Sequence, residues 1–310
     1  MTSELPVLFV DHEFPTVYAD LAAGRARMVG PHDDDLRIAV GVIAGAKRAW
    51  NADAFAASPV LRVISRVGIG YDNVDVAAAN AAGVTVCNAP EAPSVSTAEH
   101  TLALMLAVGR ELPAQQARAR AGLGGPAVGT ALEFDGRTLG LVGFGRIARR
   151  VGATALALGM RVLAYDPFLS DSAGSECELV PLAELLAKSD VVSLHAPATP
   201  ETRHMLDARA FGAMKHGVMI VNCARGALVD QAALLDALNS GQVGGAGLDV
   251  TDPEPLPSGH PLLEHPRVIV TPHIASSTTA GRRRLYEHAI DNAVNFLAGR
   301  PATIVSPPAG

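Results

Sequence analysis

Hydrophobic positions along the chain fall into short runs rich in Val, Ile and Leu, which alternate with Ala-rich stretches of helical periodicity. Near-continuous apolar runs are typical of strands that are buried on both faces. The alternation therefore predicts the α/β class, with parallel sheets covered by helices. In the first third of the chain the pattern predicts a helix over 74–82. It predicts strands near 7–10, 38–43, 61–67 and 84–87.

A long helix is predicted over residues 94–120, with Ser96 three places before Glu99 in the spacing of a capping box. Its apolar residues lie nearly all round the helix. That distribution indicates burial on more than one side, either in the core of the chain or against a second subunit, and both interpretations stay open. The Gly- and Pro-rich stretch 121–129 then interrupts the pattern, as a linker or loop does.

A second set of alternating strands and helices begins near Leu132. The last helix, expected over 278–298, is amphipathic and could return to the first domain. Strands are expected at 138–142, 161–165, 190–194, 218–222, 247–250 and 268–270. Strands in this order, with a helix in most of the gaps, suit a doubly wound nucleotide-binding domain.

Composition excludes several classes of protein. The chain has 310 residues, of which 49% are hydrophobic and 18% charged, which is enough to build two domains. Its 25 basic and 31 acidic residues are mixed along the sequence, so no nucleic-acid partner is expected. The three cysteines have no close spacing, and neither a disulfide nor a metal site is expected. The start lacks the basic region of a signal peptide and residues 102–108 are too short to span a bilayer, so we expect a cytoplasmic protein without a membrane partner.

A glycine-rich turn follows the strand expected at 138–142. Gly143 permits a tight turn, Gly145 lets the backbone approach a pyrophosphate, and Ala148 is a small residue in place of a third glycine. Asp166 ends the next strand about 20 residues later, where a carboxylate accepts hydrogen bonds from an adenosine ribose and repels a 2′-phosphate. This favours NAD over NADP. A role for Asp166 in a turn or a helix cap is the alternative.

Three reactive side chains, Arg225, Glu254 and His273, each follow a predicted strand in the second half of the chain. A guanidinium can hold a carboxylate, and a histidine can exchange a proton near neutral pH. A neighbouring carboxylate can orient that histidine and favour its charged form. Singly, each residue is equally an ordinary loop residue. Together, on the ligand-binding face of an open sheet, they predict a site that reduces a carbonyl group.

Several motifs, in one order, make the chain similar to the D-isomer-specific 2-hydroxyacid dehydrogenase family, which includes phosphoglycerate, hydroxypyruvate and glyoxylate enzymes. The resemblance covers about 61–298. Besides the segments that carry Arg225, Glu254 and His273, it rests on Arg66-Val-Gly-Ile-Gly-Tyr-Asp-Asn-Val-Asp75, Ala98-Glu-His-Thr-Leu-Ala-Leu-Met-Leu106, Leu139-Gly-Leu-Val-Gly-Phe-Gly-Arg-Ile147, His195-Ala-Pro197 and Pro200-Glu-Thr-Arg203.

The resemblance implies a Rossmann NAD-binding domain, residues 113–282, inserted in a smaller flavodoxin-like substrate domain, residues 1–112 and 283–310. It implies a cleft between them, NAD as cofactor, and a homodimer formed through the helix 94–120. The implied reaction is hydride transfer between NAD(H) and a D-2-hydroxy acid or 2-oxo acid. His273 is then the proton donor or acceptor.

In the same way, the resemblance implies that Glu254 is the partner of His273 and that Arg225 binds the substrate carboxylate. Substrate contacts are also expected from Val67, Gly68, Ile69 and Gly70. Expected cofactor contacts are Gly143, Gly145, Arg146, Ile147, Asp166, His195, Pro197, Thr202, Cys223, Ala224, Asp249, Ala275 and Ser276. For His195 a purely structural role is an equal alternative.

Two other functions stay open: an NAD(H)-sensing, corepressor-like binding protein, and a dehydrogenase of another small acid such as formate or phosphite. Arg66 lies next to the expected carboxylate loop, but a single cation is not expected to bind a substrate phosphate. With 310 residues, no additional regulatory domain of the kind found in long phosphoglycerate dehydrogenases is expected.

Overall fold

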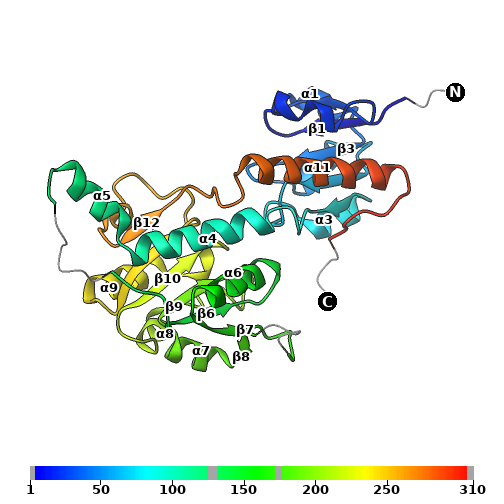
Figure 1. The fold of residues 1–310 in the computed structure, drawn as a ribbon. Coiled ribbons are helices and arrows are strands. Elements are labelled where there is room, and N and C mark those ends of the chain that lie inside the picture. The colour runs from blue at the N-terminus through cyan, green and yellow to red at the C-terminus, as the bar shows by residue number, and fades with distance from the viewer. Residues whose placement is uncertain (1–3, 125–130, 172–175, 306–310) are drawn as a thin grey trace. The chain divides into compact units, whose positions relative to one another are not determined.

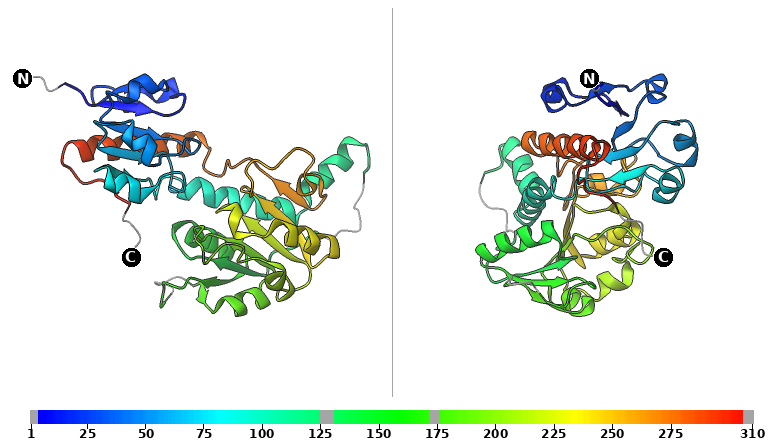
Figure 2. Two further views of the ribbon diagram at one scale, coloured as in Figure 1. Left: turned by 180° about the vertical axis from the view of Figure 1, so that it is seen from behind. Right: turned by 90° about the vertical axis from the view of Figure 1, so that its right-hand side faces the viewer.

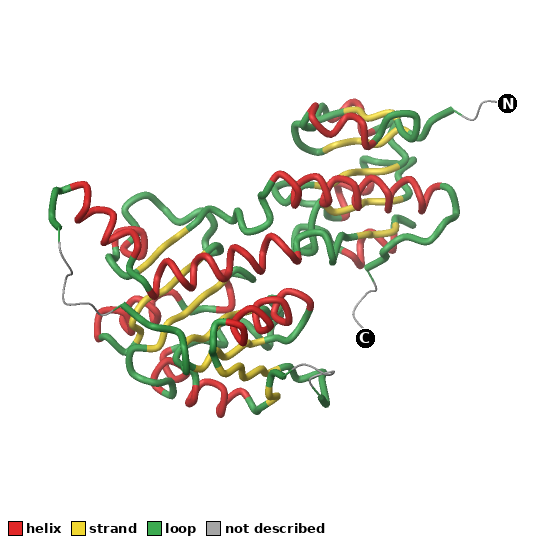
Figure 3. Tube along the Cα trace, viewed as in Figure 1, coloured by secondary structure: helices red, strands yellow, loops and turns green. Residues whose placement is uncertain are grey.

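The computed structural model describes residues 4–124, 131–171 and 176–305. They form two compact units: the first falls within 1–94 and 277–310, and the second comprises 95–276. Each unit has one parallel sheet, so the predicted α/β class is confirmed. Figure 3 shows the strands of both sheets in yellow among red helices.

The sheet of the first unit has the strand order β2-β1-β3-β4-β5, which is the flavodoxin-like order. Its strands are β1 (Val7–Val10), β2 (Arg27–Val29), β3 (Gly41–Ala44), β4 (Val63–Arg66) and β5 (Thr85–Cys87). Its helices are η1 (Thr16–Leu21), α1 (Asp33–Leu36), α2 (Ala52–Ala56), α3 (Val76–Ala81) and α11 (Thr279–Leu297). As expected for the last helix, α11 returns to this sheet and packs on β3, β4 and β5 (Figure 2).

The sheet of the second unit has the order β12-β11-β10-β9-β6-β7-β8, which is the doubly wound Rossmann order with one added edge strand. Its strands are β6 (Thr138–Val142), β7 (Arg161–Tyr165), β8 (Glu178–Leu179), β9 (Val191–Leu194), β10 (Val218–Asn222), β11 (Val243–Leu248) and β12 (Val268–Val270). Its helices are α4 (Ser94–Gly109), α5 (Leu112–Arg120), α6 (Arg146–Ala157), α7 (Leu182–Lys188), α8 (Ala208–Gly212), η2 (Gly226–Leu228), α9 (Gln231–Ser240) and α10 (Pro261–Glu264).

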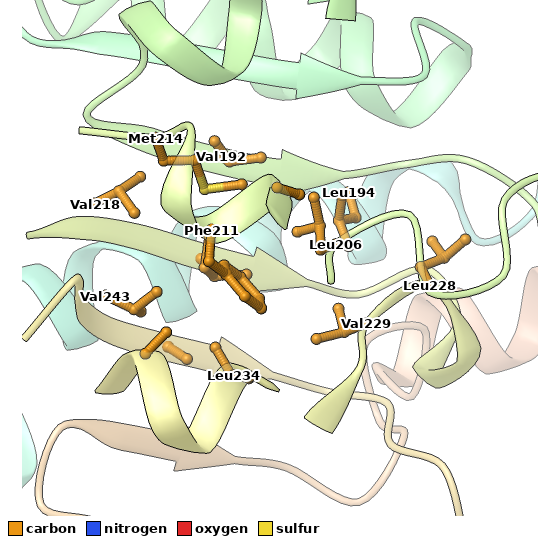
Figure 4. Packing of buried hydrophobic residues seen from close by; sticks show 14 of the residues in the cluster. Val192, Leu194, Leu206, Phe211, Met214, Val218, Leu228, Val229, Leu234 and Val243 are labelled. Atoms are coloured by element: carbon orange, nitrogen blue, oxygen red, sulfur yellow. The ribbon is translucent and has the colours of Figure 1, made fainter. Parts of the chain in front are cut away.

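Helices cover both faces of this second sheet (Figure 1). On one face, Phe211 of α8 and Leu234 of α9 pack with Val192 and Val243 of the strands (Figure 4). On the other face, α4 and α6 pack with β6 and β10. Each fully buried side chain of this kind stabilises the fold by about 1.5–3 kcal/mol, which explains why the strands read as uninterrupted apolar runs.

The single helix predicted over 94–120 is wrong. Glu111 has a φ of 53°, in the left-handed region, and Pro113 stands in the first turn of the next helix. The predicted capping box is also wrong, because α4 begins at Ser94 and includes Ser96. Of the expected linker 121–129, residues 125–129 lie outside the described residues.

Strand β11 begins at Val243, four residues before the predicted start at 247. Its glycines have no side chains, and this lets α4 approach the strand closely. A Cβ at Gly247 would lie 3.0 Å from Leu104 Cβ, and one at Gly245 would lie 2.8 Å from Val108 Cγ1. Helix α4 is thereby part of the second unit. The two units divide at 94/95 and 276/277. The domain boundaries 112/113 and 282/283, which the resemblance implies, stay a prediction. No helix among the described residues is long and apolar enough to cross a membrane.

Candidate functional site

The glycine turn after β6 lies at the point where the strand order of the second sheet reverses, between β6 and β9. Gly143 has a φ of 87°, and a Cβ there would lie 2.8 Å from the carbonyl carbon and oxygen of His195. Only glycine fits this backbone conformation and this close approach. Open α/β sheets bind their ligands at such a reversal, outside the carboxyl ends of the strands.

Helix α6 begins directly after this turn. Its N-cap is Gly145, so no side chain caps the first turn. A Cβ placed on Gly145 would have no atom within 4 Å, so the space beside it is open. The first amides of a helix without a side-chain cap form a site for an anion such as a pyrophosphate. Arg146 and Ile147 occupy the first helical turn, and Ala148 is fully buried where the helix meets the sheet.

Asp166 lies beside the glycine turn. Its Oδ2 accepts a hydrogen bond from Phe144 N at 3.0 Å, and its Oδ1 accepts one from Phe168 N at 3.0 Å. The turn role considered from sequence is therefore present. The same bonds hold the carboxylate next to the turn, where a ribose would be bound.

The loop after β9 carries His195, Pro197 and Thr202. Thr202 Oγ1 donates to Pro197 O at 2.7 Å and accepts from Thr199 N at 2.8 Å, which closes the loop. His195 Nε2 lies 2.9 Å from Ser193 Oγ, and burial lowers the pKa of His195 to about 4. The imidazole is therefore neutral at neutral pH. The bond between His195 and Ser193 supports a structural role for the imidazole, while the backbone of His195 lies against Gly143 of the glycine turn.

Arg225 follows β10 and is fixed by the side chain of Asn222. The Oδ1 of Asn222 accepts from Ala224 N at 3.0 Å, and its Nδ2 donates to Arg225 O at 2.9 Å. Arg225 itself is half-buried and donates from Nη1 to Ala224 O at 2.7 Å. The neighbouring Cys223 is not a nucleophile, because burial raises the pKa of its thiol to about 12.

The loop that carries Glu254 is pressed against the loop that carries Arg225. A Cβ at Gly226 would lie only 2.1 Å from the backbone carbon and oxygen of Thr251, so the two loops meet without a side chain between them. The amide of Gln231 donates to Asp252 O, and Thr251 Oγ1 donates to Pro253 O at 2.9 Å. These contacts fix the position of Glu254 relative to β10.

Glu254 and His273 form a close pair, with His273 Nδ1 2.6 Å from Glu254 Oε1. A carboxylate accepts hydrogen bonds, so Nδ1 carries the hydrogen and Nε2 is left to exchange a proton. The two side chains are 39% and 48% exposed, respectively, so a small molecule can reach them. Arg225, Glu254 and His273 thus follow β10, β11 and β12, three adjacent strands at one edge of the sheet.

Asp249, of which only 1% is exposed, holds the turn that presents His273. Its Oδ1 accepts from Thr271 Oγ1 at 2.6 Å and from Ile274 N at 2.9 Å, and its Oδ2 accepts from Ala275 N at 2.8 Å. The backbone carbonyl of Asp249 accepts from His273 N at 2.8 Å. His273 has a φ of 54°, and these bonds hold it in that left-handed conformation. Ser276 follows directly after Ala275 in the same loop.

His100 of α4 is a member of this network that the sequence reasoning did not assign. Its Nε2 lies 3.0 Å from Thr271 Oγ1 and 3.4 Å from Asp249 Oδ1. The motif Ala98-Glu-His-Thr contained the signal, but only the fold brings α4 to the loop after β12. Among the described residues, no group of three or more His, Cys, Asp or Glu side chains is placed to hold a metal ion.

The expected substrate loop, Val67 to Gly70, follows β4 in the first unit. Its carbonyls are bonded within the unit: Gly68 O accepts from Ala89 N at 2.9 Å, Ile69 O from Asn88 Nδ2 at 2.8 Å, and Gly70 O from Arg66 Nε at 2.9 Å. Within the described part of the chain, the amides of Gly68, Ile69 and Gly70 donate to no protein acceptor. Successive free amides of this kind suit an anion.

Arg66 supports this loop from below. The residue is 6% exposed, and Nη1 donates to Ala44 O at 2.6 Å while Nε donates to Gly70. Val67 N donates to Ala44 O at 2.9 Å. The guanidinium is therefore part of the framework that shapes the loop.

Known proteins share this arrangement of sequence and fold. Residues 102–275 match the profile of the family described as D-isomer specific 2-hydroxyacid dehydrogenase, NAD binding domain. The chain is 41% identical to D-3-phosphoglycerate dehydrogenase of Mycobacterium tuberculosis over 301 residues, which cover 94% of this chain and 57% of that protein. It is 39% identical to glyoxylate reductase of Korarchaeum cryptofilum over 263 residues, which cover 83% of this chain and 79% of that protein.

A solved structure of similar sequence has the same fold. The crystal structure of a protein from Thermus thermophilus matches with a TM-score of 0.87 and 39% identity, covering 97% of this chain and 100% of that one. By contrast, the chain spans little more than half the length of the phosphoglycerate dehydrogenase that it matches.

Proposed function

The chain belongs to the D-isomer specific 2-hydroxyacid dehydrogenase family, and on this premise we propose that it transfers hydride reversibly between NAD(H) and a D-2-hydroxy acid or 2-oxo acid. The observation that carries the proposal is the His273–Glu254 pair at 2.6 Å, which follows β11 and β12 at the same sheet edge as Arg225. Such a pair provides a positioned proton donor.

The second unit has the groups that NAD requires. The open space beside Gly145 and the uncapped start of α6 suit the pyrophosphate, and Asp166 suits the adenosine ribose. Bound NADH supplies the hydride that is added to C2 of the oxo acid. The chain's own residues then have to bind the acid, orient its carbonyl group and provide a proton.

In the proposed reduction, His273 donates the proton from Nε2 to the carbonyl oxygen, while Glu254 holds the ring through Nδ1. Arg225 binds the substrate carboxylate and polarises the carbonyl with its planar fork. The free amides of Gly68, Ile69 and Gly70 are proposed to donate to a carboxylate oxygen. In the oxidation direction His273 takes the proton back.

Asp249 and His100 act in this proposal as positioning residues. Both act through the turn that holds His273, and neither has to touch the substrate. A misplaced reacting group costs rate even when every catalytic residue is still present. The buried network is therefore expected to affect turnover as well as stability.

Replacing His273 with Ala tests the proposal. NADH oxidation is followed by absorbance with glyoxylate, hydroxypyruvate, 3-phosphohydroxypyruvate and branched 2-oxo acids. We expect kcat to fall at least about a hundredfold, because general acid catalysis contributes that much, while the Kd for NADH stays nearly unchanged. His216→Ala, which removes an exposed histidine of the same unit, is the matched control and should retain full activity.

Two results would contradict the proposal. Near-normal turnover in His273→Ala would exclude this histidine as the proton donor. A wild-type protein that binds NADH but oxidises it with none of these acids would instead favour the NAD(H)-sensing function over the enzyme.

We also propose that the protein is a cytoplasmic homodimer that contacts no nucleic acid. Leu106 of α4 and Leu112 of α5 are 37% and 54% exposed, and this supports a second chain packed on these helices. A molar mass of one chain by light scattering would contradict the dimer.

A further inference from the structure

A group of bonded side chains lies at the carboxyl end of β1 in the first unit, outside the residues assigned above. In the order β2-β1-β3-β4-β5 the connections reverse direction between β1 and β3. Asp11 and His12 follow β1, and Gly45 follows β3, so these residues flank the reversal. Flavodoxin-like sheets bind their ligands at this point.

Asp11 anchors the group. Its side chain is 1% exposed, and its Oδ1 accepts from Gly45 N at 2.6 Å while its Oδ2 accepts from Trp50 Nε1 at 3.0 Å. Burial alone would raise the pKa of Asp11, but the bonds from His12, Gly45 and Trp50 together lower it. The carboxylate is therefore ionised, and His12 Nδ1, at 2.8 Å from Oδ1, donates a hydrogen bond to it.

Tyr286 of α11 holds the other side of the His12 ring, with its hydroxyl 2.7 Å from Nε2. Tyr286 is 4% exposed, and its own ring packs against Tyr18 at 5.1 Å and edge-on against Phe14 at 5.5 Å between ring centroids. Both nitrogens of His12 are thus bonded to buried partners. The imidazole is held in one orientation and can act as a rigid wall.

The ring lies over the end of β3. A Cβ at Gly45 would be 2.9 Å from His12 Nδ1 and 3.5 Å from Cε1, so the imidazole fills the space that a side chain at residue 45 would use. The next strand of the sheet is β4, about 4.8 Å away. That strand ends in the loop whose amides, Gly68 to Gly70, are proposed to hold the substrate carboxylate. One strand spacing is comparable to the length of a small oxo acid.

We propose that His12 is a specificity-determining residue whose imidazole limits the size of the group attached to C2 of the 2-oxo acid. The inference rests on the proposed function. The side chain is 30% exposed, so its edge is available to contact a ligand while Asp11 and Tyr286 prevent the ring from turning away. The preferred substrates are then small 2-oxo acids such as glyoxylate and hydroxypyruvate, and branched acids are excluded.

The test compares kcat/KM for glyoxylate and for a branched acid, 2-oxoisocaproate, in the 310-residue chain with NADH. In His12→Ala, the ratio of branched acid to glyoxylate should rise at least about tenfold, because one methylene group in a pocket already changes selectivity about ten- to two-hundredfold. His12→Asn, which keeps a donor for Asp11 but is smaller than imidazole, should raise the ratio as well. If His12→Ala unfolds at a lower temperature than the wild type, the selectivity ratio of His12→Asn decides between the two outcomes.

The matched control is His32→Ala, which removes an exposed histidine of the same unit that makes no capping bond. Its selectivity ratio should equal that of the wild type. An unchanged ratio in both folded His12 variants, or a parallel loss for the two acids, would overturn the size limit and leave His12 with a purely structural role. A wild type without activity on any 2-oxo acid would remove the proposed function and this inference together.

Discussion

Replacement of Asp249 by Asn is the change that most directly probes how the fold positions His273. The substitution keeps the size of the side chain but converts one acceptor oxygen into an amide group that cannot accept. Both carboxylate oxygens are in use: Oδ1 accepts from Thr271 Oγ1 and Ile274 N, and Oδ2 accepts from Ala275 N. In either orientation of the amide, at least one buried donor loses its partner.

The magnitude follows from these bonds. A buried polar group without a partner costs about 1–3 kcal/mol, and hydrogen bonds to a charged group contribute about 1.5–3 kcal/mol each. The free energy of unfolding of Asp249→Asn should therefore fall by roughly 2–4 kcal/mol. The turn around His273 also loses its support, and with the ring misplaced kcat should fall at least about tenfold.

Urea unfolding followed by far-UV circular dichroism measures the stability, and NADH oxidation measures kcat. Asp236→Asn is the matched control, because Asp236 is exposed on α9 of the same unit and should tolerate the change within about 0.5 kcal/mol. If Asp249→Asn unfolded at the wild-type urea concentration and kept the wild-type kcat, the bonds of Asp249 would not be what holds His273.

Two further changes test other parts of the second unit. Gly226→Ala places a Cβ 2.1 Å from Thr251 and should separate the loops of Arg225 and Glu254. We expect kcat/KM to fall at least about tenfold. Gly212→Ala is the control, because a Cβ there meets no atom within 4 Å, and its kcat/KM should be unchanged. The pKa of His195, lowered to about 4, means that the unfolded chain takes up a proton first as the pH falls. Its contribution to the unfolding free energy should then decline between about pH 6.5 and pH 4 by at most about 3.4 kcal/mol, and His195→Asn should flatten this decline in urea titrations at several pH values.

Much of the fold could be predicted because buried parallel strands have a strong apolar signal. Strands such as β6 and β10 are buried along their whole length and were located from sequence within their observed bounds. The edge strands β2 and β8 were not predicted. They have only three and two residues and are partly exposed, so their sequences have no clear apolar run.

The errors in the helices and in β11 have one physical source. Apolar periodicity reports that a residue is buried, but it does not report which element buries it. Residues 94–109 are mostly apolar and residues 112–120 are polar, but helix-forming residues continue through both, and only the left-handed Glu111 divides them into α4 and α5. Glycines 244, 245 and 247 look like a turn, yet they lie in a strand, where Gly245 and Gly247 leave room for α4 and Gly244 lies against the backbone of Gly217.

The candidate site divides in the same way. Side chains with intrinsic chemistry, Arg225, Glu254 and His273, could be chosen from sequence because carbonyl reduction needs these groups. The residues that place them could not. Gly226 has no side chain, and this lets its loop contact the backbone of Thr251, which is 25 residues further along the chain. Asp249 accepts hydrogen bonds from the backbone amides of Ile274 and Ala275.

The two sheets use the same device where their strand order reverses. In the second unit, Gly143 lies against the loop after β9, and the carboxylate of Asp166 accepts an amide of the glycine turn. In the first unit, Gly45 lies against His12, and the carboxylate of Asp11 accepts the amide of Gly45. In each case a glycine removes a side chain and an acid fixes the turn, which leaves backbone and a few rigid groups at the edge where ligands bind. We therefore assign substrate selection in the first unit to His12, because it is the side chain that occupies the space the glycine leaves.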